Sequence, residues 1–112
     1  MTTTTESPDS RLLRVETARE ADASWVRLHG EADIATLPHL AAALDGIELD
    51  GARCWYLDVT GLEFADVATL RQLATFARQV RRSGHEIRTC GANATLRKVA
   101  SLLRVQDDLG LS

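Results

Sequence analysis

Segments with the two-residue period of a β-strand alternate along this chain with segments that have the longer period of an amphipathic helix. We expect strands at Leu12–Val15, Trp25–Leu28, Cys54–Val59 and Glu86–Cys90, and helices at Leu37–Leu44, Ala68–Arg82 and Asn93–Leu103. The resulting order is β-β-α-β-α-β-α. Strands alternating with helices in this way imply an α/β domain with a mixed sheet, parallel at its centre and joined by right-handed crossovers.

The strand-like segments carry face patterns. Val26 and Leu28 share one face of their strand, and Trp25, Arg27 and His29 share the other. The run from Cys54 to Val59 is nearly all apolar, which is typical of a central strand covered on both faces. We expect Gly61 to turn the chain after that strand.

The helix-like segments carry end signals. Thr36 is the expected N-cap of the first helix, with Pro38 in its first turn, and Asn93 is the expected N-cap of the third. Ser83-Gly84 ends the second helix. The apolar stripe of the second helix consists of Leu70, Leu73, Ala77 and Val80. Residues 106–112 are left without an expected element.

The chain has 112 residues, enough for one domain. Residues 1–10 are polar, rich in threonine and interrupted by Pro8, so we expect a disordered tail followed by a domain over residues 11–112. The net charge of −3 gives no general attraction to nucleic acid or to acidic membrane surfaces. No apolar run approaches the length of about 20 residues needed to span a bilayer, and the start has no signal-peptide pattern, so we expect a cytoplasmic protein.

No residue pattern indicates catalysis. Cys54 and Cys90 are expected to be reduced thiols in the core, without the Cys/His spacing of a zinc site. The three histidines are scattered, no glycine-rich phosphate loop precedes a helix, and no nucleophile has an evident base. We therefore expect a protein that is not an enzyme, with no cofactor or metal.

The segment from Tyr56 to Leu70 is the most informative part of the sequence. A strand ends near Asp58, a turn follows, and Asp66 lies just before a helix. Together with the segment Leu28–Thr36, which reads LHGEADIAT, it resembles the STAS domain of anti-sigma-factor antagonists over roughly Val26 to Leu111. The resemblance implies a STAS-like sheet of about four to five strands, with helices packed mainly on one face, and a protein that works by binding a partner.

Members of that family dock on an anti-sigma factor, often one with a serine-kinase fold, and so affect transcription. The kinase phosphorylates the second serine of a D-S-S-G motif, and binding is then lost. Here the aligned residues are Asp66-Val67-Ala68-Thr69. Ala68 has no hydroxyl at the family position, and Thr69 is turned by about 100° and raised by about 1.5 Å along the helix. The resemblance therefore implies the fold and the partner, but without the usual phosphorylation at Ala68; Thr69 is the remaining hydroxyl to test.

The partner-binding residues that we predict lie around the motif turn and on the helix after it: Asp33, Asp66, Val67, Ala68, Thr69, Arg71 and Arg78. Each has an ordinary alternative. Asp33 suits the start of any helix, Asp66 suits an N-cap, and the arginines suit a solvated helix face. Asp58, inside an apolar strand, is expected to be structural and to accept hydrogen bonds from nearby N–H groups.

Two further functions remain open. One is the soluble STAS subunit of a membrane transporter, such as a lipid-exporting ABC system, and the other is a scaffold subunit of a larger signalling complex. A homodimer remains open as the assembly in which the protein works. No pattern favours an enzyme or a nucleotide-hydrolysing domain.

Overall fold

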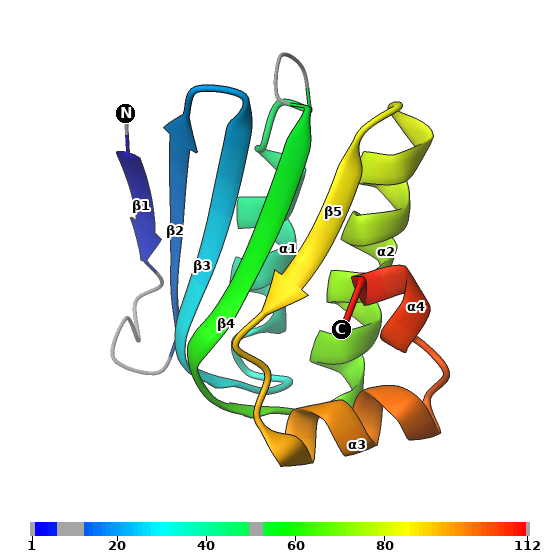
Figure 1. The fold of residues 1–112 in the computed structure, drawn as a ribbon. Coiled ribbons are helices and arrows are strands. Elements are labelled where there is room, and N and C mark those ends of the chain that lie inside the picture. The colour runs from blue at the N-terminus through cyan, green and yellow to red at the C-terminus, as the bar shows by residue number, and fades with distance from the viewer. Residues whose placement is uncertain (1, 7–12, 50–52, 112) are drawn as a thin grey trace.

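A computed structural model describes residues 2–6, 13–49 and 53–111 of the chain. Five strands form one sheet in the order β1-β2-β3-β4-β5 (Figure 1). The pairs β1–β2 and β2–β3 are antiparallel, whereas β3, β4 and β5 run parallel to one another. The strands are β1 (Thr2–Glu6), β2 (Leu13–Glu20), β3 (Ala23–Ala32), β4 (Cys54–Ala65) and β5 (Glu86–Cys90).

The helices are α1 (Leu37–Asp45), α2 (Val67–Arg82), α3 (Ala94–Leu102) and α4 (Gln106–Leu109). As Figure 1 shows, α1 and α2 cover one face of the sheet, and α3 closes the end of the molecule at which α2 begins. The expected fold class, a mixed α/β sheet of four to five strands with helices mainly on one face, is confirmed.

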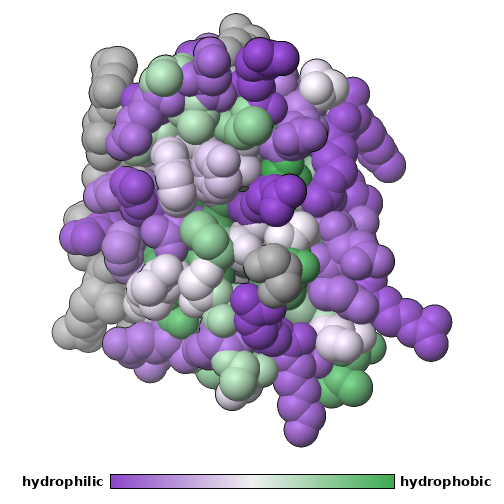
Figure 2. All heavy atoms as spheres, in the orientation of Figure 1, coloured by the Kyte–Doolittle hydropathy of each residue, from purple (hydrophilic) through white to green (hydrophobic). Residues whose placement is uncertain are grey.

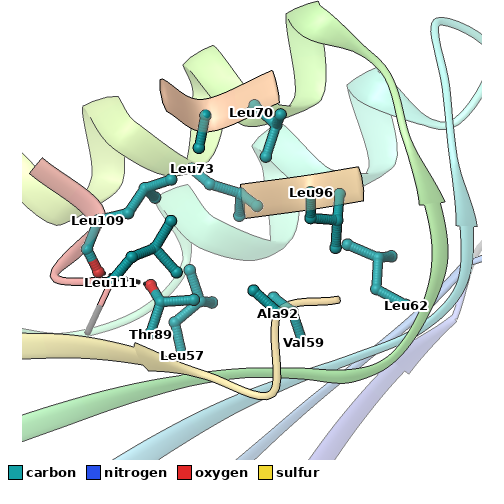
Figure 3. Close-up of a pocket in the computed structure, with 11 residues that line it drawn as sticks. Leu57, Val59, Leu62, Leu70, Leu73, Thr89, Ala92, Leu96, Leu109 and Leu111 are labelled. Atoms are coloured by element: carbon teal, nitrogen blue, oxygen red, sulfur yellow. Dashed lines mark hydrogen bonds between the residues drawn. The ribbon is translucent and has the colours of Figure 1, made fainter. Parts of the chain in front are cut away.

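The core lies between α2 and the covered face of the sheet. Leu57 and Leu62 of β4 face Leu70 and Leu73 of α2, and Leu96 of α3 closes the end (Figure 3). These side chains and their neighbours leave about 10 Å³ of free space, which is at most about one water by this measure. The expected stripe of α2 is buried at all four positions.

The strand β4 differs from its prediction in two ways. Its side chains alternate between buried and half-buried up to Val59, so it is covered on one face and not on both. Gly61 does not turn the chain: it pairs with His29 of β3, and β4 continues to Ala65. A Cβ atom on Gly61 would lie 2.6 Å from Nδ1 of His29, so glycine is needed there for close approach.

Three other expectations are corrected. Thr2–Glu6 forms β1, paired with β2, where the sequence predicts a disordered tail; residues 7–10 lie outside the described part. Residues 106–109, left unassigned, form α4, and Leu111 bridges to Thr89 of β5. Cys54 and Cys90 are free thiols, but they are half-buried on the uncovered face of the sheet and do not lie in the core.

We predict that Leu73→Ala lowers the free energy of unfolding by about 2–5 kcal/mol, because Leu73 is buried between helix and sheet and its loss leaves a cavity. The measurement is urea denaturation followed by circular dichroism. Leu102→Ala is the matched control, since Leu102 is 73% exposed, and it should change stability by less than about 0.5 kcal/mol. Equal effects of the two substitutions would mean that α2 does not pack as described.

Candidate functional site

The parallel strands β3 and β4 end side by side. Ala32 pairs with Ala65 in the last register position, and the N–H of Asp66 donates to the carbonyl of Ala32 at 3.1 Å. Because both strands end at this bond, the loop that begins at Asp33 and the turn that contains Asp66 leave the same edge of the sheet. The structure thus brings two of the predicted site residues into neighbouring loops.

Asp33 organises its own loop. Its Oδ1 accepts hydrogen bonds from the N–H of Ala35 at 2.9 Å and of Thr36 at 3.3 Å. The Thr36 hydroxyl, expected to cap α1, instead bonds back to the main chain of Asp33. The loop between these bonds holds Ile34, which is 77% exposed. The Asp33 carboxylate therefore shapes the loop.

Asp66 is the N-cap of α2. Its Oδ1 accepts a hydrogen bond from the N–H of Thr69 at 2.9 Å, the alternative that the sequence offers for this carboxylate. The side chain of Thr69 is 0% exposed, and its hydroxyl has no hydrogen-bond partner among the described residues. Ala68 is half-buried. A kinase could reach the Thr69 hydroxyl only if the first turn of α2 opened.

Three large apolar side chains are exposed at this edge. Ile34, Phe64 and Val67 are 77%, 51% and 45% exposed; we call them the apolar patch. Sequence reasoning named only Val67. Phe64 would share the buried face of Leu62 in a regular strand, but the register against β3 shifts between Gly30 and Glu31. That irregularity turns Phe64 outward.

Arg71 and Arg78 are separated by the structure. Arg71 is exposed one turn after Val67, on the same side of α2, and so lies beside the apolar patch. Arg78 is about 18 Å further along the helix from Asp66. Its Nη1 donates to Asp108 of α4 at 2.8 Å, and its Nη2 donates to the Thr75 hydroxyl at 3.3 Å.

Arg78 therefore ties α4 to α2. Arg81 supports the same junction, since it donates to the carbonyl oxygens of Asp108 and Ile87. The sequence placed Arg78 on the partner surface because helical spacing shows which residues share a stripe but not what later packs on it.

The uncovered face of the sheet is turned to the viewer in Figure 1, and Figure 2 shows that it mixes hydrophilic residues with residues of intermediate and apolar character. Trp25 stacks on Tyr56 with ring centroids 4.5 Å apart, and the Arg27 guanidinium lies 5.0 Å from the Trp25 ring centroid. Arg27 also lies 3.9 Å from the Glu16 carboxylate and 3.5 Å from that of Asp58. The charge of Arg27, at the centre of this face, is thus paired within the domain.

Asp58 has the structural role that the sequence predicts. Its Oδ1 accepts a hydrogen bond from the N–H of Thr60 at 3.0 Å. Burial raises the pKa of Asp58, but the hydrogen bonds from Thr60 and the charge of Arg27 outweigh it and hold the pKa below its usual value. The pKa of Cys90, which pairs with Asp58 across the strands, is raised by burial and by the Asp58 charge. Cys90 is thus a poor nucleophile at neutral pH.

Within the ranges described, no three histidine, cysteine, aspartate or glutamate side chains are grouped so that they could hold a metal ion. No helix in the described part of the chain is long and apolar enough to cross a membrane.

Comparison with known proteins places the chain in a family. Residues 15–111 match the family described as "Mlab, STAS domain". No curated protein matches the chain. Among solved structures, an anti-sigma factor antagonist from Mycobacterium paratuberculosis is similar with a TM-score of 0.75 and 20% identity, over 95% of this chain and 88% of that one.

Two further structures have the same fold. The Bacillus anti-sigma factor antagonist SpoIIAA, unphosphorylated, matches with a TM-score of 0.69 and 15% identity, over 88% of this chain and 87% of that one. The murine anion transporter Slc26a9 matches with a TM-score of 0.70 and 15% identity, over 98% of this chain but only 20% of the transporter. At such identities these likenesses show the fold alone.

We predict that Asp66→Ala lowers the free energy of unfolding by about 1 kcal/mol, because the N–H of Thr69 loses its acceptor. Asp66→Asn should retain most of this stability, since asparagine caps helices nearly as well. Thermal and urea denaturation measure both. Glu63→Ala, which removes an exposed carboxylate from the same edge, is the control. If Asp66→Ala were as stable as the wild type, the N-cap bond would contribute nothing.

Proposed function

The chain belongs to the STAS domain family, and from this premise we propose that it is a cytoplasmic, non-catalytic regulator that antagonises an anti-sigma factor and thereby acts on transcription. The observation that carries the proposal is the apolar patch, an exposed cluster of Ile34, Phe64 and Val67 at the edge where the family motif lies. Large apolar side chains that meet solvent beside a rigid scaffold are typical of a protein-binding surface.

The scaffold under the apolar patch is well fixed. Ile34 lies in a loop held by the Asp33 carboxylate, Val67 starts a helix capped by Asp66, and the two loops are joined through Ala32. A surface that is ordered before binding loses little conformational entropy when the partner docks. The proposed partner is an anti-sigma factor with a serine-kinase fold.

The proposed antagonist has no phosphate switch at the family position. Ala68 has no hydroxyl, and the Thr69 hydroxyl is enclosed below the first turn of α2. A phosphate on Thr69 would have to enter a packed core, where its charge could not be solvated. We therefore expect a constitutive antagonist, whose effect is set by its amount.

A second candidate function is the STAS subunit of a transporter, such as a lipid-exporting ABC system. The observation that favours it is the structural likeness to part of the anion transporter Slc26a9 across nearly the whole of this chain. A permease gene beside the gene for this protein would favour the transporter, and a kinase-like anti-sigma gene would favour the antagonist.

We predict that Ile34→Asp and Val67→Asp each weaken binding to the anti-sigma factor by about tenfold or more, because each places a carboxylate at the centre of an apolar contact. Val67→Asp should leave the fold intact, since an acidic residue is favoured in the first turn of a helix. Isothermal titration calorimetry against the kinase-fold protein measures the affinity.

The control is Ala42→Asp, which adds the same charge to an exposed position of α1. It should bind like the wild type. If all three variants bound equally well, the apolar patch would not be the contact surface, and the proposed function would lose its main support.

We further predict that prior incubation with the kinase-fold partner and ATP leaves both the mass and the affinity of this protein unchanged. Intact-mass spectrometry and a repeat titration measure these two quantities. An antagonist that carries the D-S-S-G motif serves as the positive control for the kinase. Stoichiometric phosphate on Thr69 with loss of binding would contradict the constitutive mechanism.

A further inference from the structure

The segment that holds α3, like α2, contains cationic residues and no acidic one. Residues 91–105 include Arg97, Lys98 and Arg104 but no acidic residue, whereas the whole chain has a net charge of −3. Opposite charges from distant parts of the chain could have neutralised these cations. Whether these cations are free to bind a partner depends on their having no carboxylate partner in the folded chain.

The fold leaves two of the three cations unpaired. Neither Lys98 nor Arg104 makes an ion pair with any residue that the structure describes. Arg97 donates through Nε to the carbonyl of Ala92 at 3.2 Å, which orients its side chain along the start of α3. By contrast, Arg27 on the sheet and Arg78 on α2 both have carboxylate partners.

The outer side of α3 also exposes an apolar residue. Leu102 is 73% exposed and lies one turn after Lys98, so the two side chains are neighbours on the helix surface. The inner side of α3 is fixed to the core through Leu96 (Figure 3). Ala100, on the same helix, is also buried. Arg97, Lys98 and Leu102 thus stand on a rigid helix, and Arg104 lies in the turn that follows it. We call these four residues the basic face.

The basic face lies at the same end of the molecule as the apolar patch. Leu96 of α3 packs beside Leu62 of β4 and Leu70 of α2, the elements that carry Phe64 and Val67 (Figure 3). In Figure 1, α3 runs across the end of the domain at which α2 begins. A partner large enough to cover the apolar patch is therefore well placed to reach α3.

We propose that the basic face docks on an acidic protein surface, an acidic amphipathic helix in its simplest form, with an apolar residue of the partner against Leu102. The inference rests on the proposed function and specifies its partner: a protein with carboxylates beside its contact for the apolar patch. Lys98 and Arg104, which make no ion pair with any described residue, lose no existing ion pair when they meet carboxylates. A lipid surface fits less well, because one exposed leucine offers little apolar area to insert and the net negative charge opposes approach to anionic lipid.

The test uses the full chain and a model ligand of defined chemistry. The probe is a helical peptide built from glutamate and leucine, with a second peptide that carries lysine in place of glutamate. Vesicles of phosphatidylglycerol and of phosphatidylcholine are titrated in parallel. Binding is followed by the amide shifts of the labelled protein, and affinities are taken from the titrations.

We expect the acidic peptide to shift the amides of Lys98, Leu102 and Arg104 and the lysine peptide to shift none of them. The double variant Lys98→Glu, Arg104→Glu should bind the acidic peptide about tenfold or more weakly, since two attractions become repulsions. The matched control Arg82→Glu, Arg88→Glu changes the net charge equally, at exposed positions outside α3, and should stay within about twofold of wild type.

Three results would overturn the proposal: equal weakening by the control variant, shifts confined to the uncovered face of the sheet, or binding to phosphatidylglycerol vesicles without binding to the acidic peptide. The outcome is separate from that of the proposed function. Ile34→Asp tests the apolar patch with the anti-sigma factor, whereas the peptide reports on α3 alone. Either result can therefore fail while the other stands.

Discussion

The parallel pairing of β3 with β4 is the interaction on which the candidate site depends. Val26, Leu28 and Leu57 of these strands are fully buried, so the pair is held at the centre of the core. The pairing ends with the bond from Asp66 to the carbonyl of Ala32. Two segments more than thirty residues apart in sequence thereby become neighbouring loops, and everything proposed for this edge of the sheet follows from that juxtaposition.

The surfaces of the domain differ in whether their exposed charged and apolar groups already have partners within the chain. The uncovered face of the sheet has carboxylates, cations and aromatic rings that contact one another, so a partner there would have to replace bonds already made. The loop edge and the outer side of α3 differ, because each exposes apolar or cationic groups that the domain itself does not satisfy. A partner that binds where the folded chain leaves such groups to solvent breaks the fewest existing contacts.

Short sequence patterns predicted the features that depend on residues close together in the chain. The stripe of Leu70 and Leu73 and the cap residues Asp66 and Asn93 depend on helical spacing and on nearby N–H groups, and all four occur as expected. The features that the sequence did not show depend on long-range packing. The partner of Arg78 lies thirty residues away at Asp108, and the outward turn of Phe64 follows from a register shift against another strand.

Amino-acid composition also gave wrong expectations where the structure depends on pairing between distant segments. The Thr-rich start gave no sign of a partner strand, yet Thr2–Glu6 pairs with β2, and the apolar run of β4 gave no sign that one face of the sheet would stay uncovered.

The absence of a hydroxyl at Ala68 bears on how the two proposed surfaces would select a partner. With Thr69 enclosed in the core, α2 cannot easily change its charge where it meets a partner. In the complex that we propose, discrimination among partners comes from fixed features: apolar contact at Ile34 and Val67, which salt screens little, and cationic contact at α3, which salt screens strongly. A partner that matched both proposed surfaces would bind more tightly than one that matched either alone, and this difference in affinity would be the source of specificity.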